Sequence, residues 1–77
     1  MRFDNDITLY QTIGRNIKRY REQTKLTQIQ LAERADISIS YLSKIEASGC
    51  EKSLSISVLN QIANVLEIEI INFFKEE

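Results

Sequence analysis

The stretch Leu26–Glu46, LTQIQLAERADISISYLSKIE, decides the fold, because it holds two short amphipathic helix patterns with very little chain between them. Thr27 is followed at the third position by Gln30, the spacing of a capping box in which the two side chains satisfy backbone N–H groups at the start of a helix. Ser38 has the same capping chemistry at the start of the second pattern. We therefore predict one helix from Thr27 to about Ala35 and a second helix that starts at Ser38.

The connection between these two helices is only three residues long, Asp36 to Ser38. We expect Asp36 to turn the chain with a positive φ, a conformation that Asp tolerates better than most residues. Ala32 and Ala35 are small enough to let the two helix backbones approach each other at a steep angle. The segment 27–47 is therefore predicted to be a helix-turn-helix unit.

Apolar residues at helical spacing flank this unit on both sides, and the chain has no proline and only two glycines to interrupt a helix. We predict a first helix from Asp6 or Leu9 to Thr24. A fourth should span Ile56–Leu66 with a cap at Ser55, and a fifth residues 70–75. The expected buried positions are Leu9, Ile13, Ile17 and Tyr20 in the first helix, Leu42 and Ile45 in the third, Ile56, Leu59, Ile62, Ala63 and Leu66 in the fourth, and Ile70, Phe73 and Phe74 in the fifth.

The composition limits what this all-α, five-helix chain can be. Its 77 residues suit one small domain, with 1–8 as an N-terminal extension. The longest apolar run is two residues, so we expect no membrane association and a cytoplasmic location. The single cysteine, Cys50, has no partner for a disulfide, and an incidental thiol is favoured over a redox switch. Since histidine is absent and no paired-carboxylate or nucleophile–base arrangement is visible, we expect no metal, no cofactor and no enzyme activity.

The formal net charge of −1 hides an uneven distribution of charge along the chain. Residues 15–46 carry seven basic side chains against four acidic ones, whereas residues 53–77 carry one lysine against four glutamates. A basic region favours a polyanionic partner such as nucleic acid. Ordinary solvated helix surface is the alternative interpretation, because helices often carry many charges.

The third predicted helix has two different faces. Leu42 and Ile45 lie on one side, while the opposite side carries small or cationic residues, namely Ser40, Ser43, Lys44 and Ala47. The major groove of DNA is about 12 Å wide and admits one helix, provided that its side chains are short enough for a close approach. This face is therefore predicted to read DNA, with Lys44 reaching a guanine edge or a phosphate.

Ile39 flanks this strip at the exposed start of the helix, where an apolar side chain gains little from contact with water. In one interpretation it meets the methyl group of a thymine. In the other it packs beside Ile37 or Tyr41 as part of the core. The sequence leaves the two interpretations open.

The stretch Leu26–Glu46 resembles the helix-turn-helix of the phage repressor and Cro-like family, the XRE-type bacterial DNA-binding regulators. The residues that carry the resemblance are Leu-Thr-Gln at 26–28, Leu-Ala at 31–32, Ala35, Ile-Ser at 37–38 and Tyr-Leu-Ser-Lys-Ile-Glu at 41–46. Ile13, Gly14, Arg15, Ile17 and Arg21 are similar to the family's first helix, and residues 55–66 and 68–74 to its last two. The resemblance covers about residues 9–75 and implies a compact lambda-repressor-like fold and a role in transcription.

The resemblance also implies roles for individual residues. Base edges or adjacent phosphates are the expected contacts of Ile39, Ser40, Ser43 and Lys44. Gln28 matches a phosphate contact at a helix N-terminus, which favours an anion. Further phosphate candidates are Thr27, Arg15, Arg19 and Lys52. Arg21 and Glu46 match a pair that bridges the first helix to the end of the third, although a free, phosphate-contacting Arg21 stays open.

The chain departs from the family pattern in three places. Asp36 and Glu67 stand where glycine is common, at a cost of about 1 kcal/mol each in a turn with positive φ. The segment 47–54 is about two residues longer than the family loop and lacks its proline. The reading strip has no glutamine, asparagine or arginine, the side chains best suited to bidentate base contacts, so specificity should rely on Lys44, methyl contacts and DNA shape.

We predict a transcriptional regulator that binds double-stranded DNA as a homodimer on a symmetric operator, with half-sites about 34 Å apart. Candidate dimer residues are Ile70, Ile71 and Phe74. The N-terminal Phe3, Ile7 and Tyr10 are a second candidate surface, unless they cover the core. The alternative function is a protein-interaction module or antitoxin of the same fold, whose main partner is a protein.

Overall fold

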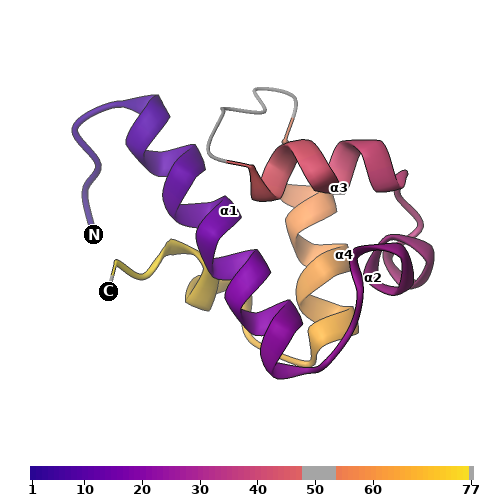
Figure 1. Cartoon of the computed structure of the whole chain (residues 1–77). Helices are drawn as coiled ribbons and strands as arrows, with labels where there is room; N and C mark the ends of the chain where they lie inside the picture. The colour runs from indigo at the N-terminus through magenta and orange to yellow at the C-terminus, as the bar shows by residue number, and fades with distance from the viewer. Residues whose placement is uncertain (48–53, 77) are drawn as a thin grey trace.

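Residues 1–47 and 54–76 are described by the structure, a computed structural model (Figure 1). Its helices are α1 (Asp6–Gln23), α2 (Gln28–Ala35), α3 (Ile39–Glu46) and α4 (Ile56–Leu66), followed by the 3-10 helix η1 (Ile70–Phe74). Figure 1 shows α4 between α1 and α2, with α3 across one end and η1 against α1. Both termini lie on the α1 side of the molecule. In the described part of the chain, no helix is long and apolar enough to cross a membrane.

The helix starts follow from local capping chemistry, as predicted. At α2 both halves of the capping box are present, with Gln30 N–H donating to Thr27 Oγ1 at 3.1 Å and Thr27 N–H to Gln30 Oε1 at 2.9 Å. Ser38 and Ser55 cap α3 and α4 with hydrogen bonds of 3.0 and 3.1 Å. Asn5 caps α1 by accepting from the Thr8 N–H at 2.8 Å, which places the start of the first helix at Asp6 rather than at Leu9.

Three of the helix ends use a residue in the left-handed conformation. Asp36 has φ 58° and Glu67 has φ 57°, at the two positions where the family often has glycine. Lys25, with φ 62°, is a third that the sequence did not indicate. At each end a backbone N–H reaches back five residues, as in a Schellman motif, for example from Ile68 to the Ala63 carbonyl at 3.1 Å.

The core gathers apolar side chains from all five elements. Ile17, Leu31, Leu42, Ile62 and Phe73 have no exposed surface, and a further seven hydrophobic residues are buried around them. Most predicted core positions are therefore confirmed, with Leu9, Tyr20, Ile70 and Phe74 partly buried at the edge.

Ile56 is the exception, because it was predicted to be buried and is 77% exposed. It is the first residue of α4, directly after the Ser55 cap. Side chains in a first turn point back toward the helix N-terminus, so Ile56 projects past the end of the core.

The last element is a five-residue 3-10 helix instead of a fifth α-helix. Its Asn72 N–H bonds the Glu69 carbonyl three residues back at 3.0 Å. A segment this short forms few i→i−4 bonds, and the tighter 3-10 turn still buries Phe73. The Asn16 side chain, 3% exposed, holds the end of η1 and the residues after it by donating to the Phe73 and Lys75 carbonyls, each at 2.8 Å.

Close contact between α1 and α3 depends on Gly14. A Cβ added there would overlap the backbone carbonyl oxygen of Ile45. The absence of a side chain at this position therefore sets how closely α3 lies against α1.

Candidate nucleic-acid interface

The outer face of α3 is a strip of exposed side chains on a firmly anchored helix. Its members are Ile39, Ser40, Ser43 and Lys44. Leu42 and Ile45 anchor the opposite side in the core, at 0% and 3% exposure. With Ser38 closing the N-terminus, the helix presents short polar groups and one cation to solvent.

The exposure of Ile39 bears on its two interpretations. Its side chain is 43% exposed and is not one of the buried residues that form the core. Ile37 and Tyr41, the partners proposed for it, do pack against the core. Ile39 therefore belongs to the outer strip and not to the hydrophobic interior.

A single carboxylate, that of Glu46, joins α3 to both neighbouring helices. Arg21 of α1 donates from Nε to Oε2 at 2.8 Å and from its terminal Nη2 to Oε1 at 2.9 Å. Gln28 of α2 donates to Oε1 at 3.0 Å. The Arg21 Nη1 group also holds the Leu26 carbonyl at 2.8 Å. The orientation of the whole helix-turn-helix unit is therefore tied to this one group.

The Arg21–Glu46 pair is largely removed from water, with 11% and 2% of the two side chains exposed. The hydrogen bond to Glu46 raises the pKa of Arg21 further above its ordinary value, against the opposing effect of burial. Arg21 thus stays protonated wherever the protein is folded. A pair of this kind contributes orientation more than net stability, since desolvation offsets much of the attraction.

Gln28 has a contact that the sequence did not indicate. The resemblance implied a phosphate contact for its side chain, and the structure directs its amide to Glu46. An amide nitrogen carries two hydrogens, so one donor is left for a phosphate. Thr27 is exposed beside it and uses its hydroxyl oxygen as the helix cap.

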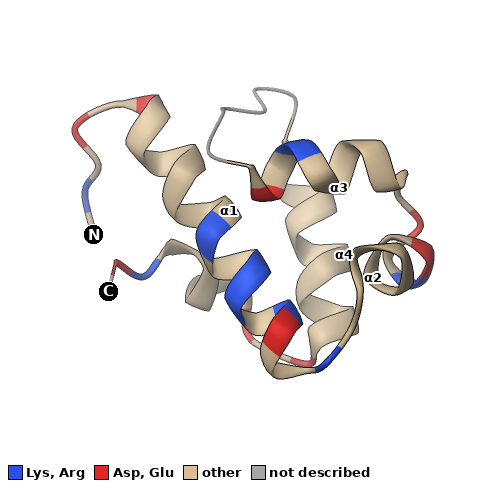
Figure 2. Cartoon of the chain, in the orientation of Figure 1, with Lys and Arg blue, Asp and Glu red and all other residues tan. Residues whose placement is uncertain are grey.

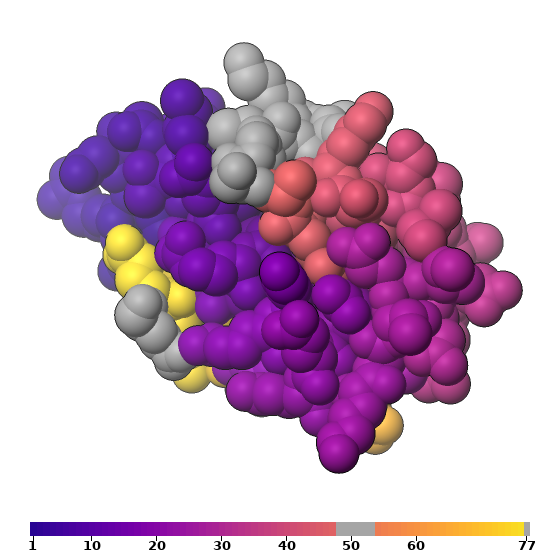
Figure 3. Space-filling view, in the orientation of Figure 1, coloured from indigo at the N-terminus to yellow at the C-terminus, as the bar shows by residue number. Residues whose placement is uncertain are grey.

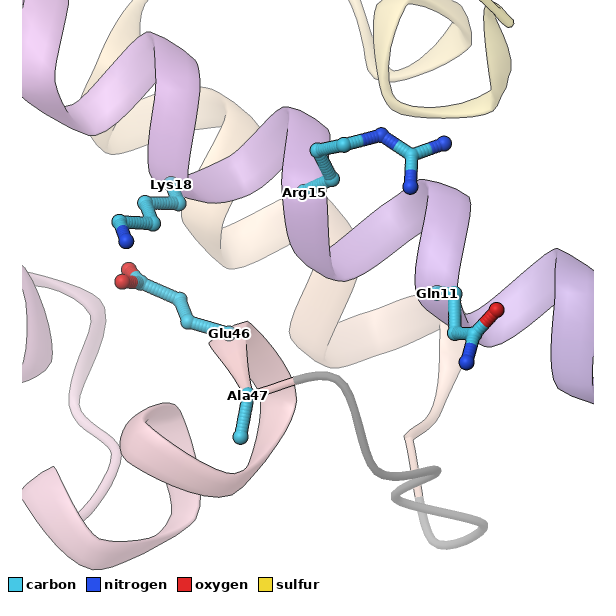
Figure 4. A pocket seen from close by; sticks show the side chains of 5 residues that line it. All are labelled: Gln11, Arg15, Lys18, Glu46 and Ala47. Atoms are coloured by element: carbon cyan, nitrogen blue, oxygen red, sulfur yellow. The ribbon is translucent and has the colours of Figure 1, made fainter.

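Two cations of α1 stand beside the end of α3. Arg15 and Lys18 are exposed and, with Gln11, Glu46 and Ala47, line a groove of about 550 Å³ (Figure 4). Figure 4 shows Lys18 pointing toward the Glu46 carboxylate. Lys18 was not among the phosphate candidates, and it follows Arg15 by three residues on the same helix face.

Arg19 has a different environment from these two cations. It is partly buried, and its guanidinium carbon sits 5.1 Å from the centre of the Tyr20 ring, a cation–π arrangement. Tyr20 in turn meets Phe73 of η1 edge-on, with ring centres 6.4 Å apart. Lys52, the last phosphate candidate, lies outside the described residues, as does Cys50.

The charges and the helices combine on one side of the molecule. Figure 2 shows lysine and arginine along the second half of α1, next to the end of α3. The space-filling view of the same side is formed mainly by α1, α2 and α3 (Figure 3). The helix-turn-helix unit and the α1 cations thus share a face.

The candidate dimer residues lie at η1. Ile71 is 47% exposed, whereas Ile70 and Phe74 are partly buried against the core. Ile71 and Phe74 border a shallow groove of about 430 Å³ together with Met1, Lys75 and Glu76.

Known proteins of similar sequence and fold are helix-turn-helix regulators. A helix-turn-helix family profile matches residues 17–72. An immunity repressor of Bacillus phage phi105 is 44% identical over 66 residues, which make up 86% of this chain and 44% of that repressor. This chain thus spans less than half the length of the phage protein.

Two solved structures resemble it over nearly their whole length. The DNA-binding domain of SinR from Bacillus subtilis has a TM-score of 0.78 and 33% identity, covering 87% of this chain and 96% of that one. SinR in complex with DNA, named as the master regulator for biofilm formation, has a TM-score of 0.75 and 33% identity, covering 82% and 98%. On this agreement of profile, sequence and fold, the chain belongs to the XRE-type helix-turn-helix family.

Proposed function

We propose that this chain is a sequence-specific regulator of transcription that binds double-stranded DNA as a homodimer on a symmetric operator and works in the cytoplasm. The observation that carries the proposal is the outer strip of α3, short and polar on a helix held by Glu46 from both sides. A helix with such a face fits the major groove. The phage repressor and the SinR–DNA complex support the proposal through their similarity to this chain.

Each part of the face has its own task. Ile39, Ser40, Ser43 and Lys44 of α3 meet base edges or the phosphates beside them. Thr27 and Gln28 meet a phosphate at the start of α2, where the helix dipole favours an anion. Arg15 and Lys18 are exposed and suited to phosphates that flank the groove, whereas Arg19, stacked on Tyr20, is less available.

Dimerisation follows from the small size of the module. One small module makes few phosphate contacts, and two modules on half-sites one helical turn apart gain affinity together. Ile71, with Phe74 in the groove beside it, is the apolar surface available at η1 for this contact.

Selection from random duplexes tests the proposal. We expect a palindromic consensus whose observed affinity falls steeply with salt, with a log–log slope of about −0.9 for each phosphate contacted. Lys44→Ala should weaken binding to the selected duplex strongly and leave the unfolding free energy within about 0.5 kcal/mol, because Lys44 is exposed. If no sequence is enriched and affinity stays weak at low salt, a protein-interaction module becomes the better assignment.

A further inference from the structure

The outer strip of α3 contains one side chain that has no polar atom, and burial within the fold accounts for only part of its surface. Ile39 is 43% exposed, is not one of the buried core residues and is flanked by serines on both sides. Exposing an isoleucine side chain to water at this position does not stabilise the protein. The side chain is therefore better explained by a surface that α3 meets than by the fold.

Ile56 provides an internal comparison. The same Ser-Ile-Ser-x-Leu pattern occurs at 38–42 and at 55–59, and in both the isoleucine is the first helical residue after a serine cap. Ile56 is 77% exposed and Ile39 only 43%. More of the Ile39 side chain is therefore covered by the rest of the protein. Because it is already more restricted, Ile39 should lose less conformational entropy than Ile56 on contact with a partner.

The chemistry of the major groove limits what Ile39 can meet there. Base edges in that groove present hydrogen-bond donors and acceptors, and the largest apolar group among them is the C5-methyl of thymine. An isoleucine pressed against a donor or acceptor would remove that polar group from water without replacing its hydrogen bond, which is unfavourable.

Resting on the proposed function, we propose that Ile39 is a specificity-determining residue that reads a pyrimidine C5-methyl group in each half-site. The neighbouring Ser40 and Ser43 are short enough to let the helix approach within contact distance of that methyl. Lys44 supplies the charged contact on the same face. The operator should accordingly contain one thymine per half-site whose methyl group matters for binding.

The test removes single methyl groups from the DNA. In the duplex obtained by selection, each symmetry-related pair of thymines is replaced in turn by deoxyuridine, which lacks only the C5-methyl. Burying one methyl-sized group is worth about a fourfold change in affinity, so we expect a loss of about 15-fold when both half-sites are changed at one particular position. Binding by the full chain is measured by fluorescence anisotropy.

The protein variants assign this effect to a residue. Ile39→Ala should bind the thymine and deoxyuridine duplexes equally at that position, and Ile39→Val should give an intermediate ratio. Ile56→Ala, the matched control on α4, should keep the full wild-type ratio. Thermal unfolding of the three variants checks that each is folded.

Two results would overturn the inference while leaving the proposed function intact. The first is a selected operator in which no deoxyuridine substitution changes affinity. The second is a methyl effect that is the same in wild type and in Ile39→Ala. If selection yields no preferred sequence at all, the proposed function itself has failed, and the inference with it.

Discussion

Single residues set how closely the helices of this protein approach each other. Gly14 is buried in α1 opposite the Ile45 backbone, and there is no room for a Cβ atom between them. Asp36 and Glu67 adopt the left-handed conformation without the freedom of glycine. The first constraint is steric and severe, whereas the second costs only about 1 kcal/mol per turn.

Gly14→Ala should destabilise the protein by about 3 kcal/mol, because the new Cβ overlaps the Ile45 carbonyl and α3 must move away. Helix propensity alone predicts the opposite sign, since alanine favours a helix by about 1 kcal/mol over glycine. Urea unfolding measures the difference. Lys18→Ala, exposed on the same helix, is the control and should change stability by less than about 0.5 kcal/mol. An unchanged or raised stability of Gly14→Ala would show that the helices pack less closely than described.

Contacts between elements explain how the outer strip of α3 is held in place. The starts of α2, α3 and α4 could be predicted from the sequence, because a serine or threonine cap bonds a backbone N–H only three residues further along the chain. The Gln28–Glu46 bond and the groove beside Arg15 and Lys18 depend on how three helices cross, which no single helix pattern contains. The Arg21–Glu46 pairing was available only through the family resemblance, since 25 residues separate the partners.

A double-mutant cycle on Arg21→Met and Glu46→Gln tests this connection. Each single change leaves a largely buried partner unpaired and should cost about 3 kcal/mol of unfolding free energy. The double variant should cost at least about 1 kcal/mol less than the sum, because neither charge is then left alone. Glu33→Gln on α2, exposed, serves as a control and should be nearly neutral. Strict additivity would mean that the pair does not hold α3.

Asn16 should have a comparable role for the end of the chain. Asn16→Ala removes one buried and one partly buried hydrogen bond to carbonyls and should cost about 2 kcal/mol, with faster hydrogen exchange in η1. Asn64→Ala, at an exposed position of α4, is the matched control and should have little effect. Equal costs for the two variants would contradict an anchoring role for Asn16.

At the scale of the whole molecule, the sequence predicted the all-helical architecture and most of the core. It failed where position along a helix mattered more than periodicity, as for Ile56, and where a short segment preferred the 3-10 turn, as in η1. In the folded protein, basic residues of the uneven sequence, Arg15 and Lys18 among them, lie on α1 beside the end of α3 (Figure 2). A net charge of −1 is therefore compatible with a face that attracts DNA.

We propose that this protein contacts DNA through α3 and the start of α2. The test is an NMR titration of the isotope-labelled chain with its selected duplex, in which the chemical shifts of the backbone amides are monitored. We predict that the largest shifts fall on residues 27–29 and 39–47, with smaller ones at Arg15 and Lys18. Shifts confined to α4 and η1, or no shifts at saturating duplex, would rule out this DNA-binding face.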